Sequence, residues 1–175
     1  MIVVGILTPN AAPAIGAVAR RAATGGGARV EVVGVAPAGG DGDRLLLELV
    51  SAGVGHATVT RSGATTVEPA DLELALRYLP DVRVIVLVAP EDQLLRVAAA
   101  GSSWSGAALV VIGPLDAAAT MAAADAAAIV LEPPAHDPDE AFAGLVAAFA
   151  RRVDAGEAPA RAWPSTLASL AVDPA

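Results

Sequence analysis

Lysine and cysteine are both missing from this chain of 175 residues, and aromatic residues make up only 3% of it. All eleven basic side chains are therefore arginines. Without cysteine the chain has no disulfide framework, no cysteine-based zinc site and no thiol nucleophile. Without lysine it has neither a Schiff-base lysine nor the lysine of a phosphate-binding P-loop. These absences exclude several large classes of enzyme and metal-binding protein.

The charge balance and the hydropathy exclude further classes of protein. Nineteen acidic and eleven basic side chains give a formal net charge of −8, which argues against a protein that binds nucleic acid. Mean hydropathy is +0.59, but every strongly apolar run ends well before the roughly 18 residues that a membrane helix needs. Met1–Leu7 runs directly into Thr8, Pro9 and Asn10, which is not the pattern of a signal peptide. We therefore expect a cytoplasmic protein with no nucleic-acid or membrane partner.

Short β-branched segments alternate with alanine- and leucine-rich segments of helical spacing, which is typical of βαβ units. Val84–Val88 is apolar at every position, as expected for a parallel strand with helices over both faces. The sequence therefore predicts a three-layer α/β/α sandwich around a Rossmann-like, mostly parallel sheet of about six strands. The predicted strands are Ile2–Leu7, Val30–Val35, Ala57–Thr60, Val84–Ala89, Leu109–Ile112 and Ala128–Leu131, and the predicted helices are Ala12–Ala23, Asp43–Ala52, Ala70–Leu79, Glu91–Ala100, Asp116–Ala124 and Pro138–Ala155.

Proline, carboxylates and glycine mark the expected ends of these helices. Pro138 stands at a helix entrance together with acidic residues, which the free N–H groups and the helix dipole favour. Gly101 is placed to end a helix as a left-handed cap. Nothing divides residues 1–156, so we expect one domain there, followed over 157–175 by a C-terminal surface extension. Within that extension, Thr166–Ala171 has the pattern of one more helical segment.

Two stretches carry a resemblance to a known family. The first, Asn10–Arg61, has an Asn-Ala helix, a strand that ends in Val33-Gly34, and a Gly40-Asp41 turn that opens a Leu-Leu helix. The second is the run Asp-Glu-Ala-Phe at 139–142. Together and in this order they resemble the ribokinase family, the PfkB-type carbohydrate and nucleoside kinases. In that family's signature, Gly-Ala-Gly-Asp-Ala-Phe, glycine amides form an anion hole and the aspartate is the catalytic base.

The resemblance implies a ribokinase-like core and roles for three residues. Glu140 falls at the position of the catalytic base, and Asn10 and Asp41 fall on the substrate side. The chain has no room before Asn10 for the family's glycine-rich substrate segment and small β-lid, and Ser62–Pro69 is too short for the returning lid strands. The resemblance therefore implies a core without a lid. The predicted core has few aromatic rings, which favours association with a partner subunit. Because the lid is missing, we expect a homo-oligomer that does not form through a lid.

The residues at the signature oppose phosphoryl transfer. When Glu140 is aligned with the aspartate, the two glycines fall at Asp137 and Asp139, with Pro138 between them. Proline has no N–H, and two carboxylates repel a phosphate, whereas phosphoryl transfer depends on stabilising negative charge. A structural role explains the same residues: Asp137 as N-cap, Pro138 as first helical residue and Glu140 in a capping box. We therefore expect that phosphotransfer is lost.

Other candidate sites have simpler explanations. Gly39–Asp43 opens a helix but lacks the spacing Gly-x-Gly-x-x-Gly, so we expect a turn with an aspartate N-cap. Asn10 either contacts a substrate hydroxyl or caps the helix that begins at Ala12. The acidic run His136–Glu140 suits a helix entrance as well as a divalent cation, and we expect no metal site. Ser102–Gly106 has no histidine partner for nucleophilic chemistry.

Three functions follow from these observations. The first, which we favour, is a ribokinase-like protein without phosphotransfer that serves as a small-molecule-binding or self-association module. Its candidate ligand is a sugar or a nucleoside, and it needs no cofactor. The second is a minimal carbohydrate kinase that uses ATP and magnesium. The third is a nucleotide-binding module similar to universal stress proteins, but Ile112–Leu115 has only one glycine where those proteins have Gly-x-x-Gly.

The fold class also predicts where a ligand binds. In an open α/β sheet, ligands occupy the crevice beyond the carboxyl ends of the strands. The segments expected there are Thr8, Asn10, Ala36–Asp41, Pro90–Asp92, Gly113–Asp116 and Pro133–Asp139.

Overall fold

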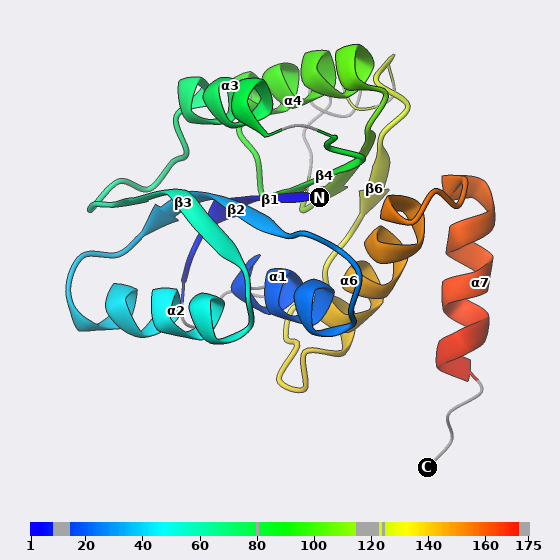
Figure 1. Cartoon of the computed structure of the whole chain (residues 1–175), viewed down its shortest axis with the longest axis horizontal. Helices are drawn as coiled ribbons and strands as arrows, with labels where there is room; N and C mark the ends of the chain where they lie inside the picture. The colour runs from blue at the N-terminus through cyan, green and yellow to red at the C-terminus, as the bar shows by residue number, and fades with distance from the viewer. Residues whose placement is uncertain (9–14, 80, 115–122, 124, 172–175) are drawn as a thin grey trace.

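The computed structural model describes residues 1–8, 15–79, 81–114, 123 and 125–171. The strands in this part of the chain form one parallel sheet of six, in the order β3-β2-β1-β4-β5-β6. The predicted α/β fold with a parallel sheet is confirmed (Figure 1). The strands are β1 (Ile2–Ile6), β2 (Glu31–Ala36), β3 (Gly55–Arg61), β4 (Val84–Val88), β5 (Ala108–Ile112) and β6 (Ile129–Leu131).

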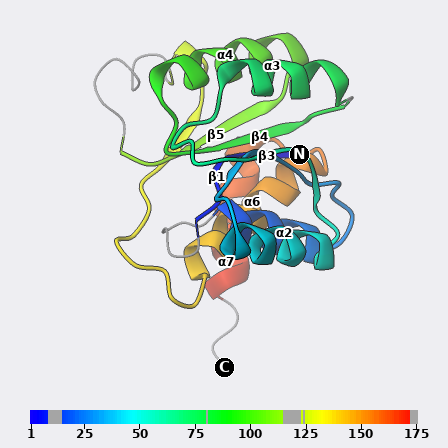
Figure 2. The same cartoon turned by 90° about the vertical axis from the view of Figure 1, so that its left-hand side faces the viewer.

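Helices cover both faces of the sheet. Figure 1 shows α3 and α4 on one face and α1, α2 and α6 on the other, with α7 packed outside α6. Figure 2 shows the same two helical layers from the side. The helices are α1 (Ile15–Thr24), α2 (Gly40–Ser51), α3 (Pro69–Tyr78), α4 (Asp92–Ser105), α6 (Ala141–Asp154) and α7 (Pro159–Ala171). The helix expected at Asp116–Ala124 falls almost entirely outside the described residues. Among the residues described, no helix has the length and apolar character to cross a membrane.

The core explains why the central strands are apolar throughout. Successive side chains of a strand point to opposite faces of a sheet. Val84 and Val86 belong to the cluster under α1 and α6, whereas Ile85 and Leu87 belong to the cluster under α3 and α4. All four side chains are fully buried. A continuous apolar run is therefore what a strand between two helical layers requires.

Helix α4 is longer than expected because of its packing against α3. Gly101 was expected to end this helix, and that prediction was wrong. A Cβ on Gly101 would lie 2.5 Å from Leu76 Cδ1, so the glycine lets α3 approach α4 in mid-helix. The helix ends four residues later, where Gly106 takes the left-handed conformation at φ 71°. Ser102 therefore lies inside α4, where its hydroxyl donates to the Ala107 carbonyl at 2.6 Å.

Helix α2 begins earlier than expected, and its cap differs. Gly39 is the N-cap residue at φ 84°, so the expected aspartate N-cap was wrong. Asp41 and Asp43 lie in the first turn instead, where the helix dipole favours carboxylates. Gly42 packs directly against the carbonyl oxygen of Pro37, and no side chain would fit there. The turn from β2 into α2 is tight for this reason.

The C-terminal region forms a full helix. Helix α7 begins at Pro159, before the segment that the sequence predicted. Trp163 packs edge-to-face on Phe149 of α6, with ring centroids 5.4 Å apart and planes at 80°. Thr166 is fully buried, and its hydroxyl donates to the Ala162 carbonyl at 2.7 Å. The helix is therefore fixed to the rest of the molecule by buried contacts on α6.

Candidate functional site

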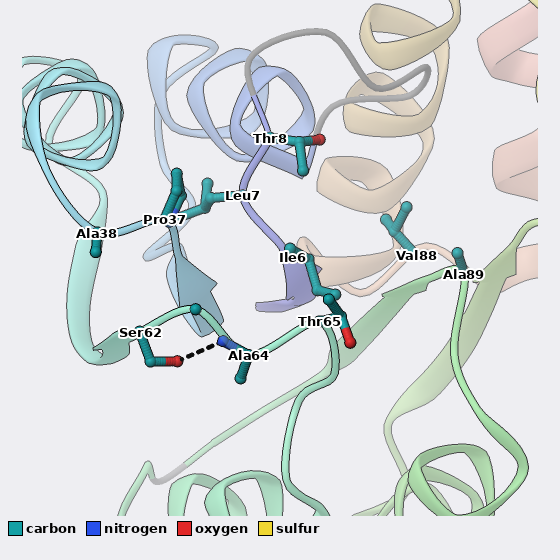
Figure 3. Close-up of a pocket in the computed structure, with 11 residues that line it drawn as sticks. Ile6, Leu7, Thr8, Pro37, Ala38, Ser62, Ala64, Thr65, Val88 and Ala89 are labelled. Carbon is teal, nitrogen blue, oxygen red and sulfur yellow. Dashed lines mark hydrogen bonds between the residues drawn. The ribbon is translucent and has the colours of Figure 1, made fainter.

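A pocket of about 520 Å³ lies at the carboxyl ends of β1, β2, β3 and β4. Its volume falls within the range of about 300–1,000 Å³ that is usual for small-molecule sites. Figure 3 shows its walls, which come from segments far apart in the sequence. The lining residues are Ile6, Leu7, Thr8, Pro37, Ala38, Ser62, Gly63, Ala64, Thr65, Val88 and Ala89.

The strand order explains this position. From β1 the chain builds the sheet outward through β2 to β3, and it then crosses back to place β4 on the other side of β1. The order therefore reverses between β1 and β4, and the helices that follow these two strands, α1 and α4, lie on opposite faces of the sheet (Figure 1). Such a switch point leaves a crevice beyond the strand ends, which is where open α/β sheets bind their ligands.

The lining is apolar except for three hydroxyl groups, and none of its residues carries a charge. Ser62 Oγ accepts a hydrogen bond from the Ala64 amide at 3.1 Å. Thr8 Oγ1 is buried and has no hydrogen-bond partner among the described residues. A buried hydroxyl without a partner costs free energy, so it is a natural contact for a polar group of a ligand. The third hydroxyl belongs to Thr65.

Ala89 adds local strain to one wall of the pocket. It has φ 46°, a left-handed conformation that residues with a Cβ rarely adopt. Its amide donates to the Ile112 carbonyl at 2.7 Å, which holds the turn after β4 in place. Strained positions of this kind occur often at binding sites.

The expected lining was correct in part. Thr8, Pro37 and Ala38 line the pocket as the topology predicted, and Asn10 lies outside the described residues. Asp41 does not line this pocket; its side chain is 72% exposed and lies 3.9 Å from the Arg44 guanidinium. The loop after β3, Ser62–Thr65, was not expected. Its run of small and hydroxyl-bearing residues directly after a strand was the signal that could have identified it.

The entrance of α6, where the sequence placed the kinase-like signature, is occupied by the chain's own side chains. The carboxylate of Asp137 accepts hydrogen bonds from the amides of Phe142 and Ala143, each at 3.0 Å. These are the free N–H groups with which a helix start attracts an anion. Asp137 therefore does satisfy the start of α6, as expected, but it does so from four residues before Ala141.

Glu140 has a different role from the one expected. It is the N-cap residue of α6 in the left-handed conformation, φ 53°, and its side chain makes no cap hydrogen bond. The capping box and the first-turn position of Pro138 were therefore wrong. The Glu140 carboxylate instead pairs with Arg20 at 2.8 Å and with Arg21 at 3.2 Å, both on α1.

The same network continues to α2. Arg20 also binds Glu48 at 2.9 Å, so its guanidinium joins α1, α2 and the entrance of α6. Glu48 in turn lies 3.4 Å from Arg44. The side chains of Arg20 and Glu140 are 26% and 35% exposed, so water screens these pairs only in part. Within the described part of the chain, no group of three or more His, Asp or Glu side chains could hold a metal ion.

Comparison with solved structures identifies the fold. No protein-family model matches the sequence, and no curated protein matches it. Solved structures do match, at identities of 10–13%. One is phosphofructokinase-2 from Escherichia coli in complex with potassium, with a TM-score of 0.64 and 13% identity over 96% of this chain and 90% of that chain.

Two fructokinases give the same result. The enzyme of Halothermothrix orenii matches with a TM-score of 0.61 and 11% identity, over 96% of this chain and 97% of its own. The ATP-bound fructokinase of Xylella fastidiosa matches with a TM-score of 0.59 and 12% identity, over 99% and 86%. The fold is therefore the ribokinase-like fold of the PfkB carbohydrate kinases, as the two sequence stretches implied. In the described residues, every strand belongs to the one central sheet, and no separate lid sheet is present.

Proposed function

We propose that this protein is a ribokinase-like binding module that holds an uncharged small molecule in the pocket and does not transfer phosphate. The observation that carries the proposal is that the groups at the start of α6 already bind other groups of the same chain. There, Asp137 already uses the amides of Phe142 and Ala143, and two arginines already hold Glu140.

A phosphate group has little to bind at this entrance. Catalysis of phosphoryl transfer depends on donors and cations that stabilise negative charge on the transferred group. Here the Glu140 carboxylate already pairs with the guanidinium groups of Arg20 and Arg21, and Arg21 also donates to the Asp139 carbonyl. Displacing Asp137 would expose a carboxylate next to the incoming phosphate. A base at Glu140 would also have to leave both of its ion pairs.

The pocket supports the choice of ligand. Its walls are formed by aliphatic side chains, and its three hydroxyl groups and backbone offer hydrogen bonds without charge. Transfer of a charged group into such a site costs more than transfer of a neutral one. A neutral nucleoside or sugar, with an apolar face and several hydroxyl groups, fits this chemistry and the volume of about 520 Å³.

Thermal unfolding in the presence of ligands tests the proposal. A ligand that binds the folded state raises Tm, and the stabilisation grows with the logarithm of the ratio of its concentration to its Kd. We expect at least one neutral probe, from a set that includes adenosine and fructose, to raise Tm. We expect ATP with magnesium to raise Tm by no more than adenosine does. Stabilisation by ATP with magnesium but by no neutral compound would contradict the proposal.

A matched pair of variants locates the binding. Ala64 is exposed at the mouth of the pocket, so Ala64→Trp fills the pocket without disturbing the core. Ala160 is equally exposed in the first turn of α7, and Ala160→Trp adds the same side chain elsewhere. We expect Ala64→Trp to abolish the stabilisation by the neutral ligand and Ala160→Trp to retain it.

A further inference from the structure

A second cavity lies between α3 and α4, and it shares no lining residue with the pocket at the strand ends. Its volume is about 490 Å³, which also falls within the usual range for small-molecule sites. The two helices lie next to each other on one face of the sheet (Figure 1). The cavity is therefore a groove along α3 and α4, and we call it the α3–α4 groove.

Part of the lining is apolar and has short side chains. Gly101 of α4 lies against Leu76 of α3, where a Cβ on the glycine would be 2.5 Å from Leu76 Cδ1. Ala100 and Val97, also on α4, add two more apolar positions. Because Ala100 and Gly101 have little or no side chain, a flat ring can lie close to the α4 backbone there.

Trp104 gives the groove an accessible aromatic surface. It is 80% exposed, the highest value among the large apolar residues that are exposed in the described chain. Its indole makes no ring–ring or cation–π contact with the described residues, whereas the other tryptophan, Trp163, packs on Phe149. Stacked aromatic rings gain stabilisation beyond the burial of their area. The indole of Trp104 is therefore available to stack on a ring of a ligand.

Three charged side chains complete the lining, and two of them are positive: Glu73, Arg77 and Arg96. In the part of the chain that the structure describes, Glu73 and Arg77 form no ion pair. Arg96 has one loose partner, the Asp92 carboxylate at 3.9 Å, which does not line the groove. The lining therefore has an excess of one positive charge, although the chain has a net charge of −8.

We propose that the α3–α4 groove binds a planar aromatic compound with a single carboxylate. The ring stacks on Trp104, and the carboxylate pairs with Arg77 and Arg96, because the guanidinium fork matches the two oxygens of a carboxylate. Glu73 selects a single negative charge, since it repels a doubly charged phosphate ester more strongly than a carboxylate. The pocket at the strand ends has no charged lining residue, so the two sites bind ligands of different charge.

Proton–nitrogen correlation NMR of the full chain tests the proposal. The chain has two tryptophans and therefore two indole N–H signals, and the variant Trp163→Phe identifies the one that belongs to Trp104. The probe is the naphthoate anion, and its controls are neutral naphthamide and the naphthylmethylammonium cation. Because water screens exposed charge pairs, we expect naphthoate to shift the Trp104 signal saturably with a Kd of only about 0.1–1 mM. Both controls are expected to bind more weakly.

Variants at the charged positions are expected to act with opposite signs. The double variant Arg77→Gln, Arg96→Gln removes the partners of the carboxylate and weakens naphthoate binding by about fivefold or more. Glu73→Gln removes the opposing charge and tightens it by about two- to fivefold. The matched control is Arg44→Gln, Arg161→Gln, which removes the same total charge at two exposed positions outside the groove and leaves the affinity unchanged.

The same spectra show the results that would overturn the proposal. One is a Trp104 signal that does not shift saturably at naphthoate concentrations up to about 10 mM. Others are naphthamide binding as tight as that of naphthoate, and an affinity that the groove variants change no more than the control does. A saturable shift of the Ala64 amide without one of Trp104 would place the probe in the pocket at the strand ends and would also refute the proposal. None of these results depends on whether that pocket binds a neutral ligand.

Discussion

Asp137 shows how one side chain decides what a helix start can bind. Its two carboxylate oxygens take the amides of Phe142 and Ala143 at 3.0 Å each, so the positive end of the α6 dipole is neutralised from within the chain. In a phosphate-binding site such amides bind the phosphate group of a ligand, whereas here they bind the Asp137 carboxylate of the same chain. These two hydrogen bonds satisfy the amides at the start of α6 from within the chain.

Loss of this cap gives the first prediction. Asp137→Ala leaves two amides at the start of α6 without their acceptor, and we expect it to lower the free energy of unfolding by about 1–2 kcal/mol. Asp139→Ala is the control, because the Asp139 side chain is exposed and only its carbonyl accepts a hydrogen bond, from Arg21. Urea unfolding measures both. Equal stabilities of the two variants would show that Asp137 is not the cap.

Two glycines in first turns give a second prediction, with opposite signs. Gly42 in α2 packs on the Pro37 carbonyl, whereas a Cβ on Gly144 in α6 meets nothing within 4 Å. We expect Gly42→Ala to destabilise the protein by about 1–3 kcal/mol through overpacking. Gly144→Ala is expected to stabilise it by up to about 1 kcal/mol through helix propensity. Thermal unfolding that finds the same sign for both would contradict this description of the β2–α2 turn.

At the scale of elements, an aromatic contact joins α7 to α6. Phe149 is fully buried, and Trp163 meets it edge-to-face. In a double-mutant cycle with Phe149→Leu and Trp163→Leu, we expect a coupling energy of about 0.5–1.5 kcal/mol, measured by urea unfolding. Effects that add without coupling would mean that α7 is held by its other contacts.

The elements were predictable to different degrees for physical reasons. The strands followed from continuous apolar runs such as Val84–Val88, because a strand that is buried on both faces is apolar at every position. The helix ends followed in part. Both ends of α3 lie within one residue of those predicted, whereas α4 ends five residues later than predicted and α6 begins three residues later. Gly101 lies inside α4, where its missing side chain leaves room for Leu76 of α3. Glu140 stands outside α6 because two arginines of α1 draw its carboxylate away.

The candidate site was predictable where topology alone determines it. Thr8, Pro37 and Ala38 follow the ends of β1 and β2, and parallel strands bring such ends to one edge of the sheet. The contribution of Ser62–Thr65 was missed because β3 has the weakest apolar pattern, and no sequence rule gives the course of the loop after it. The role of Glu140 in an ion-pair network with α1 also could not be read from spacing, since about 120 residues separate the partners.

At the scale of the whole molecule, the comparisons show the fold and leave the function to be tested. The chain shares the ribokinase-like fold with fructokinases at 11–12% identity, and a shared fold does not by itself transfer an activity. The central parallel sheet is part of this shared fold. We propose that the start of α6 does not bind phosphate in this chain, and that the molecule uses its pocket to bind a ligand.

The most direct measurement of this account is ADP release from ATP and magnesium, in the presence of a panel of sugars and nucleosides, by the wild-type chain and by Glu140→Gln. The account predicts no release above the protein-free rate and no difference between the two proteins. Release that depends on one added sugar or nucleoside, and that falls by about a hundredfold or more in Glu140→Gln, is what loss of a working general base produces. That result would show that Glu140 acts as a base and that the protein is a kinase.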